Sequence, residues 1–183
     1  MSTRISIGIA ALLALQAFVL HMLGQPWVSE SGLMLFAGDV HSVENSQQLS
    51  DWYTLSHIIH GFIFYLALWY FFPRMPVFRR LALAVGIEVA WEVAENTPTV
   101  INHYREQALA QGYTGDSIIN SLSDTCAMIA GFFFASRAPV LATIALALGL
   151  ELWVAYWIRD NLFLNVVGLF HQFDFIAQWQ AGS

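Results

Sequence analysis

Ionisable side chains stand inside segments of this chain that are apolar enough to cross a membrane, and this combination constrains the fold most. Two histidines, His57 and His60, lie in one such segment, and Glu88 and Glu92 lie in the next. Asp124 lies in a third. Charged side chains are costly in lipid and are rarely kept there without a partner or a task. The sequence therefore indicates a membrane protein with a buried site that contains acids and histidines.

Composition supports a membrane location and excludes some partners. The chain is 57% hydrophobic and only 11% charged, whereas about 25% of the residues in a soluble domain are charged. Its net charge of −6 argues against nucleic acid as a partner, because nucleic-acid binding needs a basic face. The single cysteine, Cys126, can form neither an internal disulfide nor a cysteine-based zinc site.

Apolar runs and helix-breaking residues predict an all-α fold, a polytopic membrane helix bundle in one domain over residues 1–183. The first run is expected to stay as an anchor helix, because no convincing signal-peptide cleavage site follows it. Pro73 and Pro98 end two of the runs. About five spans are predicted, over 5–23, 49–72, 81–96, 117–136 and 140–158, with outer loops over 24–48 and 97–116.

The tail differs from the spans. Over residues 161–179, apolar side chains such as Leu162 and Val166 share one helical face, and Asn161 and Asn165 share another. The apolar run is short for a membrane crossing, so we expect an amphipathic helix that lies in the membrane interface rather than a sixth span.

Arginine placement predicts the orientation. All seven basic residues are arginines. With the N-terminus in the cytoplasm, five of them face inward, namely Arg4, Arg74, Arg79, Arg80 and Arg137, and two face outward, namely Arg105 and Arg159. This distribution follows the positive-inside rule and places both long loops and the tail on the outer side of the membrane.

Helical spacing gathers the ionisable residues into stripes. Glu88, Glu92 and Glu95 are spaced i, i+4, i+7 and so share one face of a helix. His57 and His60, spaced i, i+3, are neighbours on another helix. At about 1.5 Å per residue, these stripes lie roughly 6–15 Å below the outer surface. Stripes at one depth on separate helices are expected to meet.

The fourth predicted span carries Asp124 at a similar depth, eight residues after Asp116, which stands at the outer end of that span. Asp116 is either part of the site or the N-cap of that helix. Glu151 on the fifth span lies at a comparable level and is a candidate to support the site. By contrast, Tyr104 and its neighbours His103 and Arg105 are expected to face water in a loop.

Histidines and carboxylates together suit a divalent metal, most simply zinc. We predict His57, His60, Glu88 and Glu92 as its ligands, since two carboxylates would neutralise a 2+ ion. The predicted catalytic or orienting acids are those outside this set, namely Glu95, Asp124 and Asp116. The alternative is a hydrogen-bonded network that only joins helices, without any metal.

Three functions remain open at this point. The first is a metal-dependent intramembrane hydrolase or lipid-modifying enzyme that acts on membrane lipid. The second is a proton- or cation-coupled carrier or a module that binds lipid headgroups. The third is an accessory subunit of a larger membrane complex. A homodimer or another membrane protein is the expected protein partner.

Several strings give the chain a resemblance to an uncharacterised family of proteobacterial inner-membrane proteins. They are Ser46-Gln47, Asp51-Trp52-Tyr53, Ser56 to Phe62, Trp91-Glu92, Glu95 to Pro98, Tyr104-Arg105, Gly112 to Ser121 and Asp160-Asn161-Leu162. The resemblance implies an inner-membrane location and about five spans, and it brings no known activity. The pattern from Asp116 and Asn120 to Gly131 also resembles VanZ-like membrane proteins.

Overall fold

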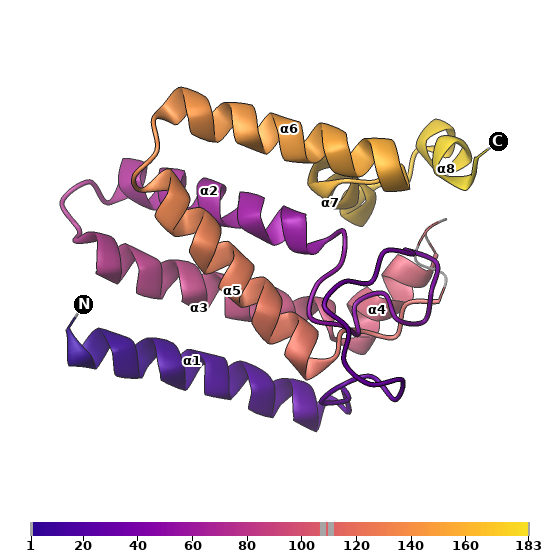
Figure 1. Cartoon of the computed structure of the whole chain (residues 1–183), viewed down its shortest axis with the longest axis horizontal. Coiled ribbons are helices and arrows are strands. Elements are labelled where there is room, and N and C mark those ends of the chain that lie inside the picture. The colour runs from indigo at the N-terminus through magenta and orange to yellow at the C-terminus, as the bar shows by residue number, and fades with distance from the viewer. Residues whose placement is uncertain (1, 107–108, 110–111, 183) are drawn as a thin grey trace.

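The computed structural model describes residues 2–106, 109 and 112–182, and this part of the chain is all-helical (Figure 1). It contains eight helices and no strand, apart from an isolated bridge between Ala37 and Asp51. The helices are α1 (Thr3–Met22), α2 (Thr54–Phe71), α3 (Val77–Glu95), α4 (Pro98–Arg105), α5 (Ile118–Ala135), α6 (Val140–Ile158), α7 (Leu162–Phe170) and α8 (Asp174–Ala181). The predicted all-α bundle is confirmed.

Four helices are long and apolar enough to cross a membrane, namely α1, α2, α5 and α6. Helix α3 has 19 residues and falls outside this group because five of them are charged. It nevertheless packs against α1, α2 and α5, so its acidic stripe faces other helices. That α3 also spans the membrane stays a prediction.

Close contact between α2 and α5 rests on two glycines. A Cβ atom at Gly61 would overlap the backbone carbonyl oxygen of Met128, and one at Gly131 would overlap that of Ile58. Small residues at such contacts let two helix backbones approach closely, as is common between membrane helices. This approach fixes the distance between the helix that carries His57 and the helix that carries Asp124.

An apolar cluster fills the bundle near the turn between α2 and α3. Its buried members come from α2, α3 and α5, and they are Leu68, Leu81, Ala84, Val85, Val89, Met128 and Phe132. The N-terminus and the α5–α6 turn lie at the same end (Figure 1). The histidines of α2 and the carboxylates of α3 and α5 lie in the opposite half of the bundle.

Loop 24–53 covers that opposite end. Its buried residues satisfy backbone groups at the start of α5, which a helix N-terminus leaves without intrahelical partners. The backbone N–H of Ser117 donates to the carbonyl of Ser46 at 2.9 Å, and the side-chain amide of Asn120 donates to the carbonyl of Gln48 at 2.8 Å. The predicted outer loop is thus packed onto the bundle.

The sequence pattern predicted one helix over residues 161–179, and this prediction is wrong. The tail forms α7 and α8, separated at His171, which is extended with φ −161°. Asp174 stands in the first turn of α8, where a negative charge favours the start of a new helix. The interfacial location of these two helices stays a prediction.

Candidate functional site

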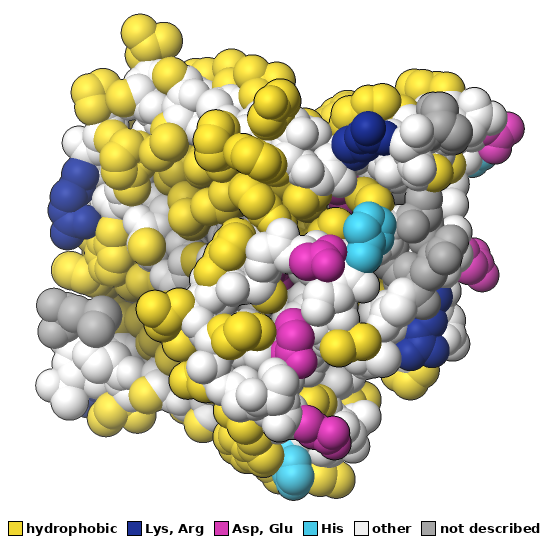
Figure 2. Space-filling view, turned by 45° about the vertical axis from the view of Figure 1, so that its right-hand side comes forward, with side chains coloured by type: hydrophobic (Ala, Val, Ile, Leu, Met, Phe, Trp, Pro, Cys, Tyr) yellow, Lys and Arg dark blue, Asp and Glu magenta, His cyan; other side chains and the backbone are white. Residues whose placement is uncertain are grey.

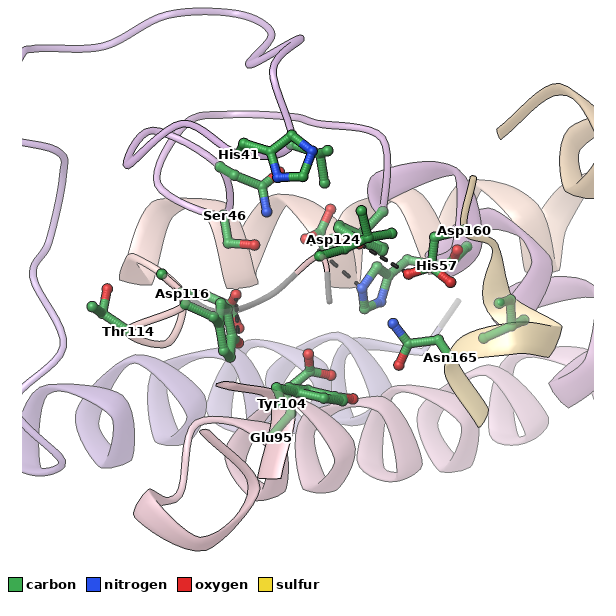
Figure 3. Close-up of a pocket in the computed structure, with 18 of the residues that line it drawn as sticks. His41, Ser46, His57, Glu95, Tyr104, Thr114, Asp116, Asp124, Asp160 and Asn165 are labelled. Atoms are coloured by element: carbon green, nitrogen blue, oxygen red, sulfur yellow. Dashed lines mark hydrogen bonds and ion pairs between the residues drawn. The ribbon is translucent and has the colours of Figure 1, made fainter. Parts of the chain in front are cut away.

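A cavity of about 280 Å³ opens at the end of the bundle covered by loop 24–53 (Figure 3). Helices α2, α3, α4, α5 and α7 all contribute to its wall. Four carboxyl groups line it, from Glu95, Asp116, Asp124 and Asp160, together with His41, His57 and His60. No arginine is among the described lining residues, and the chain has no lysine. The cavity is therefore acidic.

One buried carboxylate, Glu88, holds both histidines of α2. The Nδ1 atom of His57 lies 2.6 Å from Glu88 Oε1, and the Nδ1 atom of His60 lies 3.1 Å from Glu88 Oε2. An ionised carboxylate can only accept hydrogen bonds, so each Nδ1 donates. This arrangement leaves both Nε2 atoms available, as in histidines that bind metals while a carboxylate orients them.

A hydrogen-bonded chain runs from α1 through α5 to Glu92. The amide of Gln16, fully buried on α1, donates to Ser121 Oγ at 2.7 Å, and Ser121 Oγ donates to Glu92 Oε2 at 2.6 Å. The other oxygen of Glu92, Oε1, accepts no hydrogen bond and lies 3.3 Å from His57 Nδ1. The first helix is therefore part of the network around the site.

Asp124 faces His57 from α5. Its Oδ2 atom lies 3.8 Å from His57 Nε2, and its Oδ1 atom is buried without a hydrogen-bond partner. The Oε2 atom of Glu95 is also buried without a hydrogen-bond partner. The Glu95 side chain points into the cavity (Figure 3). Three carboxyl groups, of Glu92, Glu95 and Asp124, thus each hold an oxygen that lacks a donor.

Two groups of side chains in the described part of the chain are close enough to hold a metal ion, and both contain His57. One is His57, His60 and Glu88, and the other is His57, Glu92 and Asp124. Within each group the candidate ligand atoms lie within 4.8 Å of one another. The four ligands predicted from the sequence are therefore divided between two groups, and Asp124 joins them.

Asp116 lines the cavity but does not cap α5. Ser117 is the N-cap, with its side chain accepting from the backbone N–H of Asn120. Asp116 instead accepts from the Tyr113 hydroxyl at 2.9 Å and from the Asn96 amide. Burial raises the pKa of Asp116 to about 6, against the lowering effect of these hydrogen bonds.

Asp160 is a cavity residue outside the set of site residues predicted from the sequence. It is only 3% exposed, and it accepts from the Tyr53 hydroxyl at 3.0 Å. Burial raises its pKa to about 6. The available signal was its position in the Asp160-Asn161-Leu162 string, directly after the fifth predicted span.

Tyr104 is buried and lines the cavity. The expectation that it faces water in a loop is therefore wrong. Helix α7 contributes Asn165, whose side chain points into the cavity (Figure 3). His103 on α4 holds α7 in place through Nε2, 3.1 Å from the carbonyl oxygen of Gly168. His103 and Gly168 therefore support the cavity wall and are not part of the group around His57 and His60.

Glu151 supports the site from outside. Its two carboxylate oxygens accept from the backbone N–H groups of Leu162 and Phe163, at 3.1 and 3.0 Å. A carboxylate at a helix N-terminus satisfies orphan donors and the helix dipole. Glu151 therefore fixes α7 at the cavity, and it does not join the acids around His57.

The fold and the site define a helical membrane-protein class with an acidic, histidine-containing cavity at one end of the bundle. Hydrophobic side chains cover the left and upper surface in Figure 2, whereas acidic side chains gather toward the middle and right. The chain belongs to the family described as "Protein of unknown function (DUF2585)", whose model matches residues 20–182. The predicted membership of an uncharacterised proteobacterial family is confirmed.

Relatives match over almost the whole chain. A UPF0314 protein of Rhizobium meliloti is 52% identical over 171 residues, which cover 93% of this chain and 87% of that protein. A UPF0314 protein of Sphingopyxis alaskensis is 49% identical over 175 residues, covering 95% and 93%. No solved structure matches the chain. The likeness to VanZ-like proteins stays a prediction.

Proposed function

We propose that this protein is a membrane-embedded enzyme that uses one divalent metal ion, most simply zinc, to hydrolyse or modify a lipid. The observation that carries the proposal is the set of donor-free carboxylate oxygens around His57. Glu92 Oε1 and Asp124 Oδ1 are buried without a hydrogen-bond partner. A buried ionised oxygen without a donor is costly, and a cation bound between them would remove that cost.

The donor-free oxygens favour one of the two groups as the ligand set. Glu88 is engaged by both histidines, whereas Glu92 and Asp124 each keep a free oxygen. We therefore assign the ion to His57, Glu92 and Asp124, with Glu88 orienting His57. Two carboxylates neutralise a 2+ ion, and three protein ligands with an open position are the arrangement found in catalytic zinc sites.

His57 and Asp124 both line the cavity, so the open position faces it. A metal ion in this place supplies an activated water molecule. Glu95 is the proposed general base, because its unpaired Oε2 atom and its direction suit proton transfer within the cavity. The substrate is placed in the part of the cavity between Glu95 and α7.

The apolar cluster below the site disfavours the carrier alternative. Leu68, Val85, Met128 and Phe132 are buried in it, and a proton or ion pathway to the other end would need polar groups there. An accessory subunit with a purely structural network would bind no metal. The metal content of the protein therefore separates the proposed enzyme from this third alternative.

The location that goes with this function is a bacterial inner membrane, with the cavity facing outward. Support comes from the positions of the arginines. Arg4, Arg74, Arg79, Arg80 and Arg137 belong to the end that holds the N-terminus and the α2–α3 and α5–α6 turns, whereas Arg105 and Arg159 lie toward the cavity end (Figure 1). The positive-inside rule then puts the N-terminus in the cytoplasm.

Elemental analysis of the full chain, purified in detergent without chelators, tests the proposal. We expect close to one divalent ion per chain, and a loss of at least about tenfold in metal affinity for Asp124→Asn and Glu92→Gln. Glu106→Gln, an exposed change at the end of α4, should keep the metal. Absence of metal from the wild-type protein, even after dialysis against zinc or manganese, would rule out the metal-dependent enzyme.

A further inference from the structure

The cavity has acidic groups that the proposed metal site does not use. Asp116 and Asp160 line the cavity, 5% and 3% exposed, and the proposed metal ion neutralises neither of them. No arginine lies among the described residues of its wall. A cavity of this size with uncompensated carboxylates selects a positively charged ligand and rejects an anionic one.

The carboxyl groups share the cavity wall with one aromatic ring, that of Tyr104. Burial raises the pKa of the Tyr104 hydroxyl, and the charges of Glu95, Asp116 and Asp160 raise it further. Tyr113 packs edge-on against Tyr104, with ring centroids 5.6 Å apart. Aromatic rings and carboxylates together are the usual surroundings of a bound ammonium group.

The hydrogen-bonding groups of the cavity wall indicate which kind of ammonium group fits. Asp116 already accepts from Tyr113 and Asn96, and Asp160 accepts from Tyr53 and Gln180. Each carboxylate oxygen can nevertheless accept more than one hydrogen bond. Glu95 Oε2 accepts none. Acceptors in excess call for a ligand that donates, and a primary ammonium offers three N–H donors, whereas a quaternary ammonium offers none.

The wall of the cavity near α7 carries apolar side chains beside Asn165. Val40, Leu162 and Val166 line it, and the adjacent side chains Phe163 and Phe170 of α7 are 66% and 86% exposed. An amphipathic helix with exposed aromatic side chains is suited to the membrane interface. The cavity thus combines an acidic interior with an apolar rim that suits contact with lipid.

We infer that the substrate of this site carries a protonated primary amine, which binds in the cavity beside Tyr104, where Glu95, Asp116 and Asp160 supply the acidic wall. This inference rests on the proposed function, because it names the substrate class of the same site. The amine belongs either to a lipid headgroup or to a free polar molecule, and the arms of one binding experiment distinguish the two.

The experiment is calorimetric titration of the full chain in detergent with dihexanoyl lipids at concentrations where they are monomeric. We expect dihexanoyl phosphatidylethanolamine to bind at least tenfold more tightly than dihexanoyl phosphatidylcholine or phosphatidylglycerol. Glycerophosphoethanolamine supplies the amine without acyl chains. If glycerophosphoethanolamine binds with an affinity within threefold of that of dihexanoyl phosphatidylethanolamine, the ligand is a free amine. If it binds more weakly than that, the ligand is a lipid headgroup. Equal binding of the three lipids would overturn the inference.

Variants separate this inference from the metal proposal. Asp160→Asn keeps an acceptor for Tyr53 and should weaken amine binding at least tenfold, with metal content unchanged. Glu95→Gln breaks no existing hydrogen bond at Oε2 and serves as the second variant, with the same expected direction. Asp124→Asn should lose the metal and keep amine binding, while Glu30→Gln, exposed and outside the cavity, should change neither. Amine binding that survives both Asp160→Asn and Glu95→Gln would refute the assignment.

Discussion

The Nε2 atom of His57 lies 3.8 Å from the Oδ2 atom of Asp124. This distance exceeds that of a hydrogen bond, which joins such atoms at about 2.7–3.2 Å. Two ligands of one tetrahedral zinc ion, each about 2.0–2.2 Å from it, are separated by roughly 3.3–3.6 Å. The observed separation is thus closer to that of two ligands of a common ion.

X-ray absorption spectra of zinc-loaded protein should therefore show a shell of nitrogen and oxygen ligands only, at about 2.0–2.2 Å. Cys126, two residues after Asp124, is exposed and free. A sulfur ligand at about 2.3 Å would place the ion at Cys126 and contradict the assignment to His57, Glu92 and Asp124.

Removal of the Ser121 hydroxyl should weaken metal binding. Ser121 Oγ donates to Glu92 Oε2 at 2.6 Å and so directs the other oxygen of Glu92 toward His57. Loss of an outer partner of this kind costs about 10–100-fold in metal affinity, so Ser121→Ala should fall in that range. Ser123→Ala, on the same helix and only half-buried, is the matched control. Equal affinities of the two variants, measured by competition with a fluorescent chelator, would remove Ser121 from the network.

Gly61→Ala should destabilise the bundle strongly. The added Cβ atom would overlap the backbone carbonyl oxygen of Met128, and a backbone atom cannot move aside as a flexible side chain can. Overpacking of this kind costs about 1–3 kcal/mol or more. Gly149→Ala on α6 meets nothing within 4 Å and should be neutral or slightly stabilising in thermal unfolding in detergent. Similar melting temperatures for both variants would argue against the close α2–α5 contact.

Asp160 should make stability depend on pH in a defined direction. Burial raises its pKa from 3.8 to about 6 in the folded protein, so its ionised form opposes folding above pH 6, and this penalty declines as the pH falls. Asp160→Asn does not titrate. Its stability gain over wild type should therefore be smaller at pH 5 than at pH 7.5, by about 1–1.5 kcal/mol.

The control for this pH effect is Glu30→Gln, because Glu30 is exposed. Its difference from wild type should stay nearly constant between pH 5 and pH 7.5 in the same thermal unfolding assay. A gain for Asp160→Asn that grows as the pH falls would show that the carboxyl group is stabilised in its charged form.

Cysteine labelling of intact cells tests the orientation. In a Cys126→Ser background, Val43→Cys in loop 24–53 should react with an impermeant maleimide, since Val43 is 83% exposed. Met75→Cys, in the turn between α2 and α3, should react only after the membrane is opened. The reverse pattern would place the cavity on the cytoplasmic side.

Sequence by itself determined the helical class, the family and the stripes of ionisable residues. The spacing of Glu88, Glu92 and Glu95 puts them on one helical face whatever the helix packs against, because helix geometry is local. The apolar runs likewise predicted the long helices to within a few residues, since proline and polar residues mark their ends.

Tertiary structure decided which atoms meet. Glu88 and Glu92 look equivalent in the sequence, yet the packing of α2 against α3 and α5 gives Glu88 two histidine donors and leaves an oxygen of Glu92 free. Asp160 enters the cavity because α6 ends beside Tyr53, a contact between residues 107 positions apart. Such contacts depend on how whole helices pack, including the glycine approach of α2 to α5, and periodicity within a single helix carries no information about them.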